Sequence, residues 1–168
     1  MKKRNRNMAK KKTLLTSSGA AKLEEELQNL KQVRREEIRQ KLKEARAQGD
    51  LSENAEYDAA KNEQAEIEAR IADVEEILEN AEIVPDETDL SHIFIGAEVK
   101  LLDMEFDEEI TVHIVGSKEA NSLAGRISNE SPMGAALLGK AVGEQADVQA
   151  PDGVFSYKVL EIRKTETE

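Results

Sequence analysis

The sequence contains no cysteine and no tryptophan, and aromatic residues make up only 3% of its 168 residues. Without cysteine there are no disulfides and no thiolate metal sites, as is usual in a reducing cytoplasm. No apolar run approaches the ~20 residues that a membrane span needs, and the N-terminus lacks the apolar core of a signal peptide. We therefore expect a cytoplasmic protein with no membrane partner.

Conventional catalytic motifs are also missing. There is no glycine-rich phosphate loop, no G-x-S-x-G and no histidine-based metal motif. The two histidines, His92 and His113, fall at the edge of a predicted strand and within one, and we expect both to be ordinary surface residues. The sequence thus offers no enzyme active site of a familiar kind.

The charge, −11 overall, is unevenly distributed along the chain. Residues 1–12 hold seven Lys or Arg and no acid, which predicts a disordered basic tail, with a nucleic-acid arm as the alternative. Residues 13–48 hold eight basic and six acidic residues, whereas residues 50–89 hold two basic and fifteen acidic ones. This asymmetry favours pairing between the two segments, and the acidic total makes general nucleic-acid binding unfavourable.

Two long helical patterns, Ser17–Gln48 and Asn54–Ala81, flank a short turn that begins at Gly49. Glycine is the usual left-handed end of a helix. Short polar residues can cap both helices: Thr16 or Ser17 for the first, Ser52 or Asn54 for the second. Helices of this length joined by so short a turn must fold back on each other. Residues 13–84 are therefore predicted to form an antiparallel coiled-coil hairpin.

The seam of this hairpin can be read from the apolar spacing. On the first arm it runs through Ala20, Leu23, Leu27 and Leu30, slips with Val33 as a bridge, and resumes at Ile38, Leu42 and Ala45. On the return arm small residues precede large ones: Ala55, Ala59, Ala65, then Ile67, Ile71, Val74 and Leu78. The hairpin is expected to be thin near its turn, either for insertion into a narrow opening or simply for close packing.

Residues 85–91 form an acidic, proline-containing linker, after which the apolar period changes from helical to two. Alternating segments predict strands over 97–101, 110–114, 146–150 and 154–162, with Pro151-Asp152-Gly153 as a turn. Ser131-Pro132, the apolar residues up to Leu138 and then Gly139 predict one short helix. The fold class is therefore α+β, with a small, mostly antiparallel sheet domain over residues 92–168.

Two carboxylates, Asp50 and Glu53, lie in the turn of the hairpin. Oxygen ligands three residues apart suit a hard cation such as Mg²⁺, although two alone would bind it weakly and a partner would have to supply the others. Composition alone favours a plain capped turn over such a shared metal site.

Three separated motifs resemble the GreA/GreB family of bacterial transcript cleavage factors. They are GDLSENAEYDAAKNEQ (residues 49–64) preceded by EAR, the earlier AAKLEEEL and VRREEI segments, and SPMGAALLGKAVGE (residues 131–144). The similarity covers roughly Leu14 to Arg163, and the residues around the turn are closer to the GreA branch than to GreB. The basic N-terminus has no counterpart in the pattern, and SPMG lacks a charged residue often found in that segment.

This resemblance implies a hairpin followed by an FKBP-like domain, together acting on RNA polymerase as a monomer. The C-terminal domain would dock on the rim of the secondary channel, and the hairpin would enter it. Asp50 and Glu53 would help to hold an Mg²⁺ of the polymerase's own active site, so that the polymerase hydrolyses the extruded 3′ end of the nascent RNA. The chain would thus be a cofactor of the polymerase and not itself an enzyme.

The resemblance also assigns roles elsewhere. Arg46 and Lys61 would bind phosphates of the extruded RNA, and Tyr57 would stack on a base or merely shield the turn. The polymerase-binding residues would come from the short-helix segment, with at least one of the two leucines expected in the core: Ser131, Pro132, Met133, Leu137, Leu138 and Lys140. Two alternatives stay open, an inhibitory channel binder without cleavage and a prolyl isomerase or chaperone. The intact Asp50/Glu53 pair argues against the first, and the few aromatics of the second domain against the other.

Overall fold

The computed structural model describes residues 12–49 and 54–165. The basic tail up to residue 11 and the turn residues Asp50 and Glu53 lie outside the described residues. The chain forms two compact units, one over Ala20–Glu79 and one that joins the residues up to Gly19 with those from Asn80 onward. No described helix combines the length and the apolar content needed to cross a membrane.

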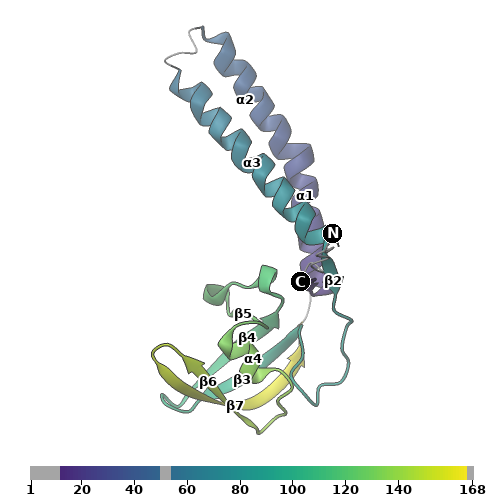
Figure 1. The fold of residues 1–168 in the computed structure, drawn as a ribbon, viewed down its shortest axis with the longest axis vertical. Helices are drawn as coiled ribbons and strands as arrows, with labels where there is room; N and C mark the ends of the chain where they lie inside the picture. The colour runs from purple at the N-terminus through teal and green to yellow at the C-terminus, as the bar shows by residue number, and fades with distance from the viewer. Residues whose placement is uncertain (1–11, 50–53, 166–168) are drawn as a thin grey trace, which may run out of the picture. The chain divides into compact units, whose positions relative to one another are not determined.

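The first unit is the hairpin (Figure 1). Its first arm consists of α1 (Ser17–Asn29), the π-helix η1 (Leu30–Arg34) and α2 (Arg35–Ala47), and its second arm is α3 (Ala55–Glu79). Figure 1 shows α2 and α3 side by side, running in opposite directions. Their shared core consists of Ile38, Leu42, Ala60, Ile67 and Ile71, with Leu27, Leu30 and Tyr57 packed against it.

The seam of the second arm differs from the predicted one by one position at each end. Ala55, Ala59 and Ala65 are exposed, and Ala60 is the buried small residue near the turn. At the far end Ile77 is 6% exposed, whereas Leu78 is only partly buried. Along the buried seam the small Ala60 precedes the larger Ile67, Ile71, Val74 and Ile77, although Tyr57 packs nearer the turn. The small seam residue was misplaced because the adjacent Ala59 and Ala60 give no unique helical phase.

The second unit is built on a five-stranded sheet with the order β5-β4-β3-β7-β6. Its strands are β3 (Ala97–Asp103), β4 (Glu108–Val115), β5 (Arg126–Ser128), β6 (Gln145–Ala150) and β7 (Gly153–Lys164). Three neighbouring pairs are antiparallel, and β4 and β5 are parallel. A parallel pair needs a crossover connection, which here contains the 3₁₀ turns η3 (Ser117–Glu119) and η4 (Ser122–Ala124).

One face of the sheet is covered by the short helix α4 (Pro132–Leu137), as Figure 1 shows. Alternate residues of β3 point into this core, as the period-two pattern predicts: Ala97, Val99 and Leu101 are completely buried. Leu137 of α4 is also completely buried in the same cluster. The expectation that one of the two α4 leucines belongs to the core is therefore met by Leu137.

A small parallel pair, β1 (Thr13–Leu15) with β2 (Ala81–Ile83), belongs to this second unit and was not predicted. It is fastened by Glu119, whose side chain is only 3% exposed. The Glu119 carboxylate accepts hydrogen bonds from the Thr16 backbone N–H (2.8 Å) and hydroxyl (2.6 Å), and lies 3.3 Å from Arg126 Nη2. The Thr16 hydroxyl in turn accepts from Gly19 N, so Thr16 caps α1 as predicted.

Candidate functional site

The end of the hairpin nearest the turn is held by Asn54. Its Oδ1 accepts hydrogen bonds from the N–H groups of Glu56 and Tyr57, both at 3.1 Å, which is the geometry of a helix cap. Its Nδ2 donates to the Ala45 carbonyl at 2.9 Å and so ties α3 to the last turn of α2. The cap was predicted, and the cross-arm bond was not. Gly49 has a φ of +107°, which explains why glycine ends the first arm.

Tyr57 lies on the first turn of α3, partly buried against the hairpin core. The guanidinium carbon of Arg46 lies 5.8 Å from the centre of its ring, within the range of a cation–π contact. The structure therefore brings together two of the three predicted RNA-binding residues. The contact places the guanidinium of Arg46 over the ring of Tyr57.

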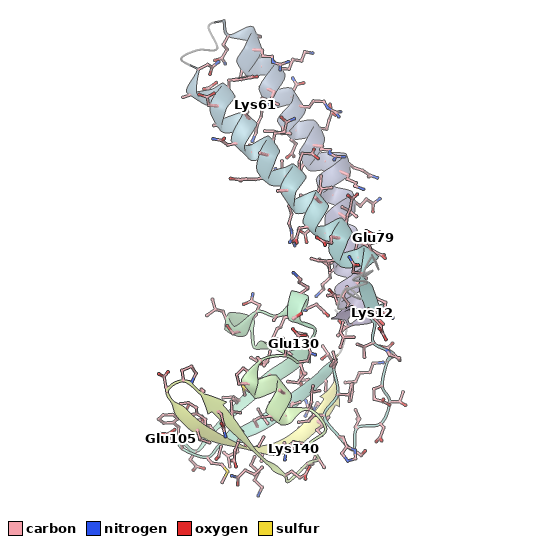
Figure 2. The ribbon with its side chains drawn as sticks, in the orientation of Figure 1. Lys12, Lys61, Glu79, Glu105, Glu130 and Lys140 are labelled. Atoms are coloured by element: carbon pink, nitrogen blue, oxygen red, sulfur yellow. The ribbon has the colours of Figure 1, made fainter. Side chains whose placement is uncertain are left out.

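Lys61, the third predicted residue, lies on α3 one turn beyond Tyr57, and Figure 2 shows it toward the turn end of the helix. An open surface pocket of about 410 Å³ joins it to the first arm. The pocket is lined by Arg39, Leu42, Lys43, Arg46, Lys61 and Gln64. Four cations from two helices therefore share one surface, which suits the phosphates of a nucleic-acid backbone.

Arg39 and Lys43 are functional candidates that the sequence reading missed. Together with Arg46 they are spaced by four and three residues, which places all three on one face of a helix. That spacing, next to the seam residue Leu42, was the sequence signal that could have identified them. Lys43 and Arg46 line the same pocket as Lys61, so the three cations lie on a common surface.

A belt of ion pairs joins the two arms further along, as the charge asymmetry predicted. Lys41 and Arg34 both bind Glu63, at 2.7 and 3.0 Å. Arg35 binds both oxygens of Glu68, at 2.7 and 2.6 Å. The hydrogen bond from Lys41 lowers the pKa of Glu63, and that from Arg35 lowers the pKa of Glu68. Exposed pairs contribute little singly, but here they fix which side chains face across the arms.

The α4 segment of the sheet unit is rigidly built. Ser131 Oγ accepts from Gly134 N (3.1 Å) and donates to the Ser128 carbonyl (2.7 Å). A Cβ on Gly134 would lie 1.9 Å from the same carbonyl, so only glycine fits there. Met133 and Leu138 are partly buried against the core, whereas Pro132 and Ala135 are exposed.

The predicted polymerase-binding residues of this segment thus divide in two. Leu137 is buried and supports α4 from inside, whereas the exposed and half-buried positions lie at the surface. Lys140 follows α4, and its backbone carbonyl accepts from Ile93 N at 2.8 Å, so the backbone after the helix is also fixed. Figure 2 shows Lys140 and Glu130 on the two sides of this segment.

Comparison with known proteins covers both units. Residues 13–83 match the family described as transcription elongation factor, N-terminal, and residues 87–164 match transcription elongation factor, GreA/GreB, C-terminal. The chain belongs to the GreA/GreB family of transcription elongation factors. The resemblance stated from the sequence motifs is therefore confirmed.

Individual relatives of the GreA/GreB family match along almost the whole chain. Transcription elongation factor GreA of Lachnoclostridium phytofermentans is 56% identical over 94% of this chain and 99% of its own length. Its namesake from Clostridioides difficile is 53% identical over 92% and 98%. Among solved structures, GreA factor homolog 1 of Thermus thermophilus is 34% identical over 90% of this chain and 99% of its own, with a TM-score of 0.42.

Proposed function

We propose that this chain stimulates the cleavage activity of RNA polymerase, entering the secondary channel by its hairpin and releasing arrested elongation complexes in the cytoplasm. The proposal rests on family membership over both units together with the GDLSENAEY turn, which carries Asp50 and Glu53. The cationic surface beside the turn supports it, because an RNA 3′ end extruded toward a hairpin tip brings phosphates with it.

In this mechanism each part of the chain has a separate task. The α4 segment, Ser131–Lys140, docks on the rim of the channel through its exposed and half-buried side chains. Arg39, Lys43, Arg46 and Lys61 hold the extruded RNA by its phosphates. The ion-paired arms keep these cations on one surface as the hairpin enters.

Asp50 and Glu53 are the residues that would hold Mg²⁺, and carboxylate oxygens are the donors that this ion prefers. When bound, such an ion activates and orients the water that attacks a phosphodiester. Two carboxylates leave several coordination positions to be filled by water and by the polymerase. Over residues 12–49 and 54–165, no group of three or more acidic, histidine or cysteine side chains forms a metal site. In the proposed mechanism the ion would be shared with the polymerase, because two carboxylates alone bind it weakly.

The test uses a stalled elongation complex whose RNA is labelled at its 5′ end, incubated with the protein and Mg²⁺. The RNA should shorten from its 3′ end far faster than with polymerase alone. Asp50→Asn or Glu53→Gln should abolish the stimulation while still competing with the wild-type protein for polymerase, because each keeps its size but loses a negative ligand. Additional Mg²⁺ or Mn²⁺ should restore part of the activity by mass action.

Glu56→Gln is the matched control, since Glu56 is an exposed acid two residues from the cap Asn54. It should cleave as the wild type does. Normal cleavage by Asp50→Asn and Glu53→Gln at limiting Mg²⁺ would refute the mechanism. Binding without any cleavage by the wild-type protein would instead identify an inhibitory channel binder.

A further inference from the structure

The first arm of the hairpin contains one residue more than its seam requires. Its buried or half-buried apolar residues alternate by three and four up to Leu30, which would place the next ones at positions 34, 37, 41 and 44. The seam instead resumes at Ile38, Leu42 and Ala45, and the last three positions are each shifted by one. The structure absorbs the shift in η1, where Arg35 N donates to the Leu30 carbonyl five residues back. A π-turn of this kind accommodates one inserted residue.

The inserted residue changes what lies at this level of the seam. A regular repeat would place one side chain against the second arm at this level. Here Arg34, the last residue of the π-turn, reaches Glu63, and Arg35, which follows it, reaches Glu68. Glu63 and Glu68 are five residues apart on α3, so they lie about 140° apart around that helix. The two arginines therefore form ion pairs with two different sides of α3.

The burial of the apolar seam does not require this insertion. Gln32 and Val33 inside the π-turn are exposed, Val33 to 44%, and neither belongs to the hairpin core. Without one of them, Leu30 and Ile38 would be seven residues apart, and the arm could be α-helical throughout. The extra residue costs regular hydrogen bonding and adds up to about 1.5 Å to the first arm alone. What it changes is the position of α2 along α3.

We propose that the π-turn η1 and its two arginines are a positioning device, which sets the axial register of α2 against the turn-proximal half of α3. The cationic pocket is built across that register, with Arg39, Lys43 and Arg46 on α2 facing Lys61 on α3. The Asn54–Ala45 hydrogen bond depends on the same register. The inference rests on the proposed function, because the register matters only if this end of the hairpin must meet reacting groups closely.

The perturbation is deletion of Val33, which removes the extra residue and leaves every seam residue in phase. Because the seam stays buried, the melting temperature should stay within a few degrees of wild type or rise, and competition for polymerase should be unchanged. A shift of about 1 Å at a site of chemistry can lower a rate by about 100-fold. We expect the stimulated cleavage rate to fall at least about tenfold, while Val33→Ala, which keeps the length, matches wild type.

Each other outcome has a definite meaning. Wild-type cleavage by the Val33 deletion would refute the positioning role. A large loss of melting temperature, repeated when Gln32 is deleted instead, would show that the insertion serves folding and would also refute it. An equal loss in Val33→Ala would assign the effect to the side chain and not to the register. If the wild-type protein itself fails to stimulate cleavage, the proposed function fails, and this inference fails with it.

Discussion

Replacing Glu119 by alanine removes the carboxylate that fastens the N-terminal strand to the sheet unit. Its side chain is 3% exposed and accepts two hydrogen bonds from Thr16, one to a backbone N–H and one to a hydroxyl. Arg126 loses its partner as well, but its side chain is 31% exposed and can be rehydrated. Breaking a buried, charge-assisted network costs about 3–5 kcal/mol. Because Arg126 can recover water, we expect about 3 kcal/mol.

Urea unfolding followed by circular dichroism measures this loss, and a thermal melt should show a decrease of roughly 6–12 °C. The control is Glu105→Ala, which removes an exposed carboxylate in the turn between β3 and β4 and should stay within about 0.5 kcal/mol of wild type. Figure 2 shows Glu105 at that turn. If Glu119→Ala lowers the free energy of unfolding by less than about 1 kcal/mol, the stabilising role of Glu119 is refuted.

Gly19 offers an independent check on the same contact. A Cβ there would lie 2.0 Å from Glu119 Oε1, an oxygen held in place by the Thr16 hydroxyl. Gly19→Ala alone should therefore cost about 1–3 kcal/mol. In the Glu119→Ala background the clash is gone, and alanine should be neutral or stabilise α1 by up to about 1 kcal/mol. Additive losses in the double variant would contradict this geometry.

Three further predictions concern surfaces. Arg39→Ala combined with Lys43→Ala should slow cleavage of long extruded RNA more than of short RNA, and should reduce the salt dependence of the process, because phosphate contacts release counterions. The pKa values of Glu63 and Glu68 are lowered, so their ion pairs stabilise the hairpin at pH values above the ordinary carboxyl pKa. That contribution should be lost as the pH falls below about 4.5, so melting curves from pH 7 to 3 should decline less steeply for the Gln variants. Ala135→Asp, on the exposed side of α4, should weaken competition for polymerase without lowering the melting temperature by more than a few degrees.

The hairpin was predictable because its signals are local. Apolar spacing identified both arms, Gly49 marked the end of the first arm, and Asn54 marked the start of the second. Even the seam slip between Leu30 and Ile38 was visible, and the structure shows it to be a π-turn. The exact residues of the second seam were not predictable, because neighbouring alanines differ little in hydropathy and only the partner helix selects Ala60.

The contacts that sequence reasoning missed join residues far apart in the chain. β1 and β2 are three residues each and pair Thr13 with Ala81, so neither has enough length to show a period. Glu119 looks like any acid in a polar loop until Thr16 is brought to it. A carboxylate is predicted to be buried only when its hydrogen-bond partners are known, and here Thr16 lies 103 residues away in the sequence.

The cationic surface depends both on local residue spacing and on contacts between residues far apart in the chain. The spacing of Arg39, Lys43 and Arg46 places them on one face of a helix, but the sequence does not say that this face adjoins Lys61. That depends on the register of the two arms, which we propose is set by paired charges and by one inserted residue. If the register is what matters, then shortening the first arm by one residue should separate binding from cleavage, whereas removing single cations should only weaken the hold on RNA. These two signatures differ, so the architecture of the hairpin can be tested separately from its charge.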